Sequence, residues 1–156
     1  MWDRMRKQIL LEQEQLHRLF DVYRSHIKQS CAGQPDRVEC SALAAMLHSF
    51  YTGVENIFKR IAVECDGGAP RGAGWHRALL EAMTRPGPNR PPVISEGTRL
   101  VLRGYLDFRH VFRQAYAFEL RWEKMADLVG NCENTWQQFE SELDKFVGAL
   151  DAAPES

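Results

Sequence analysis

The chain has 156 residues, of which 26% are charged and 44% are hydrophobic, and its formal net charge is −1. These values are typical of one globular domain with a single core, and they exclude disordered and fibrous proteins. The near-zero net charge also argues against a protein that binds nucleic acid over much of its surface.

Two long helices are predicted in the first half of the chain. Residues 2–29 lack Gly and Pro and carry apolar residues at helical spacing, namely Ile9, Leu16, Phe20, Tyr23 and Ile27. After a Gly-Pro break, Asp36 is predicted to be an N-cap, with Glu39 three residues later in a capping-box arrangement. The second helix should run to about residue 64, and Gly53 within it is typical of close helix packing.

The second half is predicted to contain one short helix and two longer ones. The expected elements are a Gly-rich loop, a short helix, a Pro-rich loop and two helices (66–74, 75–84, 86–92, 96–118 and 120–150). Ser95 is the predicted N-cap of the fourth helix, and Gly130 marks a predicted break in the fifth. No stretch alternates as a strand does. The fold class is therefore all-α, an antiparallel four/five-helix bundle with one short extra helix, in a single domain over residues 1–156 with a disordered tail from 151 to 156.

The helix predicted at 96–118 carries the chemistry. At 100° per residue its core face should be Val101, Tyr105, Phe108 and Phe112. The opposite face holds Arg103, Asp107, His110 and Gln114, and the flank between them holds Leu102, Leu106, Arg109, Arg113 and Tyr116. Such a face can be a solvated surface on which Arg103 pairs with Asp107. It can also be a site where His exchanges protons and Arg holds a phosphate, which suffices for metal-free RNA cleavage.

The segment LDFRHVFRQAY (106–116), followed by FELRW (118–122), resembles the HEPN superfamily, specifically its HepT-like branch. Further similarity lies in residues 50–61, 75–83 and 91–95, so the resemblance covers about residues 5–148. It implies a helical bundle that forms a homodimer, places two Arg/His motifs across a cleft and cuts RNA. It also implies an antitoxin partner, an MNT-type nucleotidyltransferase, which modifies a motif tyrosine with AMP.

The HepT motif is Arg, four residues, His, one residue, Tyr, and this chain departs from it. Aligned on Arg109 and Tyr116, Gln114 stands where the His is expected, and glutamine cannot act as a general base. A looser HEPN pattern allows six residues between Arg and His, as between Arg103 and His110. Either His110 supplies the chemistry from a shifted position, or the site is degenerate.

We expect His110 to act as general base or acid, Arg109 or Arg103 to anchor the phosphate, and Tyr116 to orient the substrate or accept AMP. Residues expected to contribute to RNA or phosphate binding are Arg113, Gln114 and Asp107.

On the second helix, Glu55, Asn56 and Tyr51 are candidate supporting polar residues, because the resemblance places a polar residue there near the motif. The alternative is a surface pair between Glu55 and Lys59 at i+4. At the start of the short helix we expect Trp75 to be packed and His76 to be exposed.

The charge is unevenly distributed along the chain. Residues 71–121 hold nine Arg, no Lys and four acidic residues, which gives +5, whereas the remainder carries −6. Arginine suits bidentate contact with phosphate, so a formal net charge of −1 is compatible with a protein that binds RNA in one cleft.

No segment has the ~18 apolar residues of a membrane span, and the N-terminus lacks an apolar export signal, so we expect a cytoplasmic protein with no membrane partner. The four cysteines are then expected to stay reduced. They form no CxxC pair and stand at no zinc-ligand spacing with the histidines, so no metal and no cofactor are expected.

The sequence thus leaves three functions open. The first is a metal-independent endoribonuclease toxin of a toxin–antitoxin pair. The second is a catalytically degenerate interaction subunit for a nucleotidyltransferase. The third is a plain structural bundle.

Overall fold

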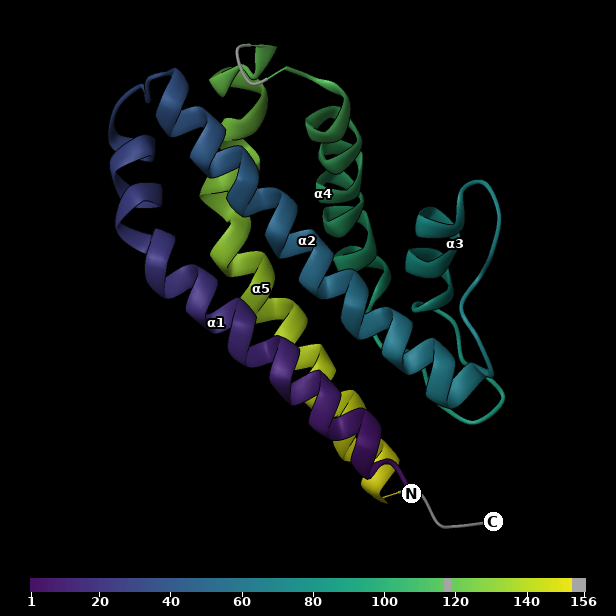
Figure 1. The fold of residues 1–156 in the computed structure, drawn as a ribbon. Helices are drawn as coiled ribbons and strands as arrows, with labels where there is room; N and C mark the ends of the chain where they lie inside the picture. Colours follow the sequence, from purple (N-terminus) through teal and green to yellow (C-terminus); the bar gives the residue numbers. More distant parts are fainter. Residues whose placement is uncertain (117–118, 153–156) are drawn as a thin grey trace.

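The computed structural model describes residues 1–116 and 119–152, which form five α-helices (Figure 1). The helices are α1 (Asp3–Ala32), α2 (Arg37–Asp66), α3 (Trp75–Ala82), α4 (Glu96–Gln114) and α5 (Trp122–Ala152). Within these described ranges there is no strand, only an isolated bridge between Gly87 and Arg90. The predicted all-α bundle with one short extra helix is confirmed. The described helices include none with the length and apolarity needed to cross a membrane.

Helix α2 is the centre of the bundle and packs against each of the other four helices (Figure 1). Its buried residues therefore lie on more than one face, as expected for a helix that is surrounded by others. Aromatic rings from α1, α4 and α5 fill the space around it. Phe50 of α2 contacts Phe20 and Tyr105 edge-on, with ring centroids 5.8 and 5.2 Å apart, and Phe58 contacts Phe139 at 5.5 Å.

Gly53 lets α1 approach α2 closely. A Cβ atom at this position would lie 2.7 Å from Cδ2 of Leu16, closer than van der Waals contact allows. The prediction of close helix packing at Gly53 is confirmed.

The predicted helix starts are also confirmed. The Asp36 side chain accepts a hydrogen bond from the Glu39 backbone N–H at 2.8 Å, and Ser95 Oγ accepts one from Thr98 at 3.2 Å. Helix α2 ends at Asp66 and is capped by Gly67, which has a positive φ of 80°.

Three predictions about α4, α5 and the tail need correction. Helix α5 passes through Gly130 without a break, because one glycine costs only about 1 kcal/mol in a helix whose neighbours Val129 and Cys132 are fully buried. It also runs to Ala152, two residues into the tail predicted from residue 151, while residues 153–156 lie outside the described residues. Helix α4 ends at Gln114 and not at the predicted residue 118. Residues 117 and 118 lie outside the described residues.

The buried face of α4 is rotated from the predicted one. Val101, a residue of the predicted core face, is 47% exposed, whereas Leu102 and Leu106, residues of the predicted flank, are buried. The reason is that α4 packs against α2, α3 and α5, so the covered side includes the flank that faces α3. Tyr105 and Phe108 are buried as predicted.

A buried arginine holds the Pro-rich loop against the end of α2. Arg90, whose side chain is 2% exposed, donates from Nε and Nη2 to the two carboxylate oxygens of Asp66, both at 2.9 Å. It also donates to the backbone carbonyls of Ala82, Arg85 and Pro91. Gly87 makes room for this pair, since a Cβ there would lie 2.6 Å from Asp66 Oδ1.

All four cysteines carry free thiols. Cys31 is exposed near the end of α1, whereas Cys40, Cys65 and Cys132 are buried. Burial raises the pKa of all three buried thiols, that of Cys65 to about 11.

Candidate functional site

Glu55 is the one charged residue that α2 buries, with 2% of its side chain exposed. Its two carboxylate oxygens have separate partners on different helices. Oε1 accepts a hydrogen bond from Arg109 Nη1 of α4 at 2.7 Å, and Oε2 lies 2.8 Å from His76 Nδ1 of α3. The carboxylate thus joins three helices at one point.

This arrangement explains how the core accommodates a charged group. A buried carboxylate is strongly destabilising unless it is paired and hydrogen-bonded. The alternative in which Glu55 pairs with Lys59 on the surface is wrong, because Glu55 is buried and its partners are Arg109 and His76. Lys59 instead places its Nζ 4.6 Å from the ring centroid of Trp75.

His76 was predicted to be exposed, but its side chain is only 20% exposed. Its ring stacks on that of Trp75, with centroids 3.6 Å apart. A carboxylate only accepts hydrogen bonds, so Nδ1 of His76 carries the hydrogen that bonds Glu55. The other ring nitrogen, Nε2, makes no hydrogen bond within the part of the chain that the structure describes.

On α4, His110 completes this group of side chains. Its ring meets that of His76 edge-on, with centroids 6.2 Å apart. A small cavity of about 10 Å³ is lined by His76, Leu106, Arg109, His110 and Arg113. This is close to the space needed for one water, so a larger ligand would lie over the mouth of the cavity. We call Glu55, His76, Arg109, His110 and Arg113 the Glu55 cluster.

The geometry places His110, and not Gln114, beside Arg109. Gln114 is the last residue of α4, is exposed and does not line the cavity. Arg103 and Asp107 also lie outside it and pair with each other at 2.8 Å, as the solvated-face interpretation expects. The predicted candidates therefore divide between a group at the cavity and a group on the open surface.

Two buried polar atoms, one within the cluster and one beside it, have no hydrogen-bond partner among the described residues. One is Nε of Arg109 and the other is the hydroxyl of Tyr51, which is fully buried. Burial is the main cause that raises the pKa of Tyr51 above its ordinary value, and the negative charge of Glu55 adds to it. Buried polar groups without partners are rare in folded proteins.

Asn56 and Tyr116 lie apart from the cluster. Asn56 faces α1, where its Nδ2 donates to Glu12 at 3.3 Å. Tyr116 follows α4 and is 70% exposed. The candidate supporting residues thus separate: Glu55 is in the cluster, Tyr51 lies beside it, and Asn56 points to another surface.

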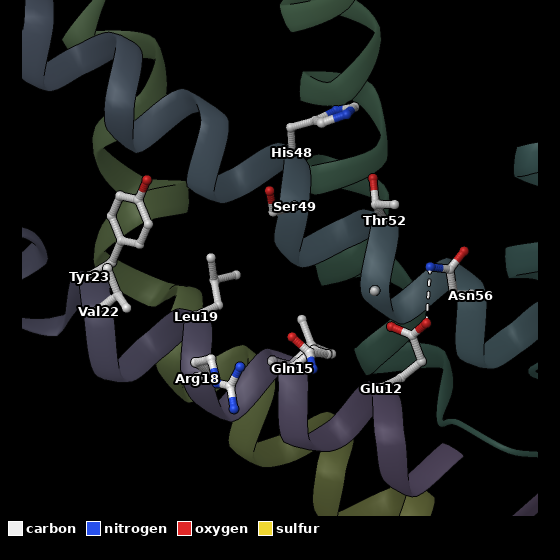
Figure 2. Close-up of a pocket in the computed structure, with 12 residues that line it drawn as sticks. Glu12, Gln15, Arg18, Leu19, Val22, Tyr23, His48, Ser49, Thr52 and Asn56 are labelled. Carbon is white, nitrogen blue, oxygen red and sulfur yellow. Dashed lines mark hydrogen bonds between the residues drawn. The ribbon is translucent and has the colours of Figure 1, made fainter. Parts of the chain in front are cut away.

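That other surface is a groove of about 550 Å³ between α1 and α2 (Figure 2). Thr52 and His48 of α2 lie along it, and Thr52 Oγ1 and His48 Nδ1 are buried without a partner among the described residues. The His48 ring also lies 5.0 Å from Phe112 of α4. Burial, together with the charges of Arg109 and Arg113, lowers the pKa of His48.

Ion pairing reduces the basic surface that the sequence suggests. Five of the nine arginines in residues 71–121 have carboxylate partners, namely Arg77, Arg90, Arg99, Arg103 and Arg109. Arg113 makes no ion pair within the described residues, and it lines the cavity. Its guanidinium is therefore available to an anion.

Sequence reasoning missed His76 as a member of the site. Helical spacing relates residues of one helix, whereas His76 and Glu55 are 21 residues apart on two helices. A usable signal was present nonetheless. A lone carboxylate within an apolar helix requires a buried donor, and the Trp-His pair at the start of a short helix offered one.

Comparison with known families agrees with the helical architecture. The family model described as "HepT-like protein" matches residues 42–150, which is more than half of the chain and extends from α2 into α5. Helix α1, part of the resemblance inferred from sequence, lies outside this match. No curated protein and no solved structure matches the chain. The extent of the family match shows that the chain belongs to the HepT-like family, of the HEPN type.

Proposed function

We propose that the protein is a toxin-type endoribonuclease that cleaves RNA without a metal ion. In this proposal it acts in the cytoplasm as a homodimer, with an MNT-type nucleotidyltransferase as its antitoxin partner. The observation that carries the proposal is the meeting of His110, Arg109 and Arg113 at one cavity, with Arg109 anchored on the buried Glu55.

The reaction is a transesterification within the RNA strand. A base removes the proton from a ribose 2′-hydroxyl, and the oxygen attacks the adjacent phosphorus. The new O2′–P bond forms as the P–O5′ bond breaks, and the leaving 5′-oxygen takes up a proton. The products are a 2′,3′-cyclic phosphate and a 5′-hydroxyl, so no oxidant or further reactant is needed.

The side chains at the cavity suit these steps. His110 is the base, since histidine exchanges protons near neutral pH. Arg113 binds the phosphate and stabilises the negative charge that builds up on its oxygens in the transition state. Arg109 contributes its charge from a fixed position, because Glu55 holds one of its Nη groups.

The test is cleavage of a short RNA by the purified protein in EDTA. His110→Ala and Arg109→Ala should each reduce the rate by about 10²–10⁴-fold, the range for loss of a proton-transfer group or of an anion-stabilising one. Arg77→Ala is the matched control, because Arg77 pairs with Glu81 on the exposed side of α3. Activity that survives in both site variants would contradict the assignment.

Gln114 favours a second candidate function, a non-catalytic subunit that binds a nucleotidyltransferase. In that case the wild-type protein cuts no RNA but still forms a complex with the partner. The same partner also tests Tyr116. The partner would transfer AMP from ATP to the Tyr116 hydroxyl and release pyrophosphate. Mass spectrometry should show this modification lost in Tyr116→Phe and retained in Tyr23→Phe.

A further inference from the structure

The proposed reaction needs one group that accepts a proton and another that gives one. Helix α4 provides one histidine, His110, and Gln114 at the motif position can do neither. The structure contains a second histidine at the same cavity, from a different helix and outside the Arg/His motif.

We infer that His76 is the proton donor to the leaving 5′-oxygen, so that His76 and His110 together form an acid–base pair within one protomer. This inference rests on the proposed ribonuclease activity and extends it by one catalytic residue.

The hydrogen bond to Glu55 determines which atom of His76 is available. Nδ1 is bound to the carboxylate at 2.8 Å and keeps its hydrogen in both protonation states of the ring. Proton exchange therefore occurs at Nε2. Stacking on Trp75 and the buried carboxylate fix the ring, as a positioned acid requires.

The neighbours of the two rings fit this division of roles. His76 has the carboxylate of Glu55 from α2 as its partner, and Lys59 of the same helix lies 4.6 Å from the ring centroid of Trp75. His110 has Arg109 and Arg113 near it on α4. The hydrogen bond from Nδ1 to Glu55 orients the His76 ring and leaves Nε2 as the atom that gives a proton, and His110, beside Arg109 and Arg113 at the same cavity, is the base of the proposed reaction.

The separation of the rings is compatible with this division. The ring centroids of His76 and His110 are 6.2 Å apart. The attacking and leaving oxygens lie on opposite sides of the phosphorus in an in-line displacement, so the two proton-transfer groups must be separated by several ångströms. Arg109 and Arg113 line the same cavity, where they can contact the phosphate oxygens.

The test exploits the fact that a good leaving group needs no proton. Wild type and His76→Asn are compared on RNA and on uridine 3′-(4-nitrophenyl phosphate), whose nitrophenolate leaves unprotonated. Asparagine can still donate to Glu55 but has no second nitrogen that exchanges protons. We expect His76→Asn to lower kcat on RNA about 10²–10³-fold and to change the rate on the nitrophenyl ester less than about 5-fold. His110→Asn should slow both reactions.

His17→Asn is the matched control. His17 also pairs with a glutamate, Glu140, at 2.8 Å, but lies on α1 away from the cavity. It should leave both rates unchanged. If His76→Asn does not fold, as judged by circular dichroism, His76→Ala with added imidazole replaces it. Rescue of RNA cleavage by imidazole supports the inference, and a folded His76→Ala that is not rescued contradicts it.

The outcomes separate the two proposals. Equal losses on both substrates would mean that His76 only maintains the structure, and wild-type rates on both would remove it from the reaction; either result overturns the inference while the ribonuclease proposal stands. If the wild-type protein cleaves neither substrate, the ribonuclease proposal fails, and the acid–base assignment fails with it.

Discussion

Two largely covered arginines, Arg90 and Arg109, link α2 to later parts of the chain, and they differ in how fully their N–H groups are used. Arg90 donates to both oxygens of Asp66 and to three backbone carbonyls. Arg109 donates to one oxygen of Glu55, and its buried Nε has no partner among the described residues.

The difference separates a structural ion pair from a candidate site. A ligand at Arg90 would have to displace a hydrogen bond that already holds the loop. At Arg109 the guanidinium is fixed by one bond, lies beside a cavity and has donor capacity left for a phosphate. Burial alone does not distinguish the two, since both side chains are largely covered, at 2% and 13% exposed.

The largest effect on stability is expected from Arg90→Ala. It leaves a buried carboxylate and three carbonyls without their donor, so the free energy of unfolding should fall by about 3–5 kcal/mol. Urea denaturation measures this change. RNA cleavage per folded molecule should stay at the wild-type level, and a loss of stability below about 1 kcal/mol would show that Arg90 is not the structural link described above.

Replacing each arginine by lysine should have opposite effects: Arg90→Lys should lower stability more than Arg109→Lys does, and Arg109→Lys should lower RNA cleavage more than Arg90→Lys does. Lysine cannot make the bidentate contact, so Arg90→Lys should cost about 1–3 kcal/mol of unfolding free energy. Arg109→Lys keeps one ion pair with Glu55 and should cost less, yet it should reduce RNA cleavage at least about 10-fold. Denaturation and kinetic measurements on both variants provide the comparison, and equal effects of both substitutions would remove the distinction.

Gly87→Ala tests the space around the Arg90–Asp66 pair. The added Cβ would lie 2.6 Å from Asp66 Oδ1 and 3.1 Å from Arg90 Cγ, so we expect a loss of about 1–3 kcal/mol in thermal or urea unfolding. Gly97→Ala is the control. Its Cβ meets nothing closer than Ser95 Oγ at 3.9 Å, and alanine in the first turn of α4 should stabilise by up to about 1 kcal/mol. The same sign in both variants would contradict the packing argument.

The smallest expected effect concerns His48, on the α1–α2 side of the Glu55 cluster. Its pKa is lowered in the folded protein, so the unfolded chain binds a proton more readily. Stability should therefore be unaffected above about pH 6.5 and decrease as the pH falls below it. The ring is partly solvated, so the effect should be below about 0.5 kcal/mol. Urea unfolding between pH 7 and 5 should show a shallower decrease for His48→Gln than for the wild-type protein.

Most of the fold could be predicted from sequence, because helix ends and apolar stripes depend on neighbours along one helix. Asp36 and Ser95 cap the helices that they were expected to cap, and Gly53 marks the close contact of α1 with α2. The break at Gly130 was wrong, since packing of the residues around it outweighs a weak local preference.

The site was less accessible to sequence reasoning, because its contacts join three helices. Spacing on α4 identified Arg109, His110 and Arg113, but it could not show which of them share a cavity. It also could not bring Glu55 and His76 to that cavity, since Glu55 and Arg109 are 54 residues apart in the chain. Only the packing of α3 and α4 on α2 determines which polar groups meet.

The four thiols differ in exposure, so a label can be attached selectively at one of them. Cys31 is the exposed one, and burial with a raised pKa protects the other three from reagents that attack thiolates. A spin label or fluorophore added under mild conditions should therefore attach at a single place, near the end of α1. In a symmetric pair of chains two such labels would give one well-defined distance, so spectroscopy on the unmodified sequence can determine whether two copies assemble and can restrict how they are arranged.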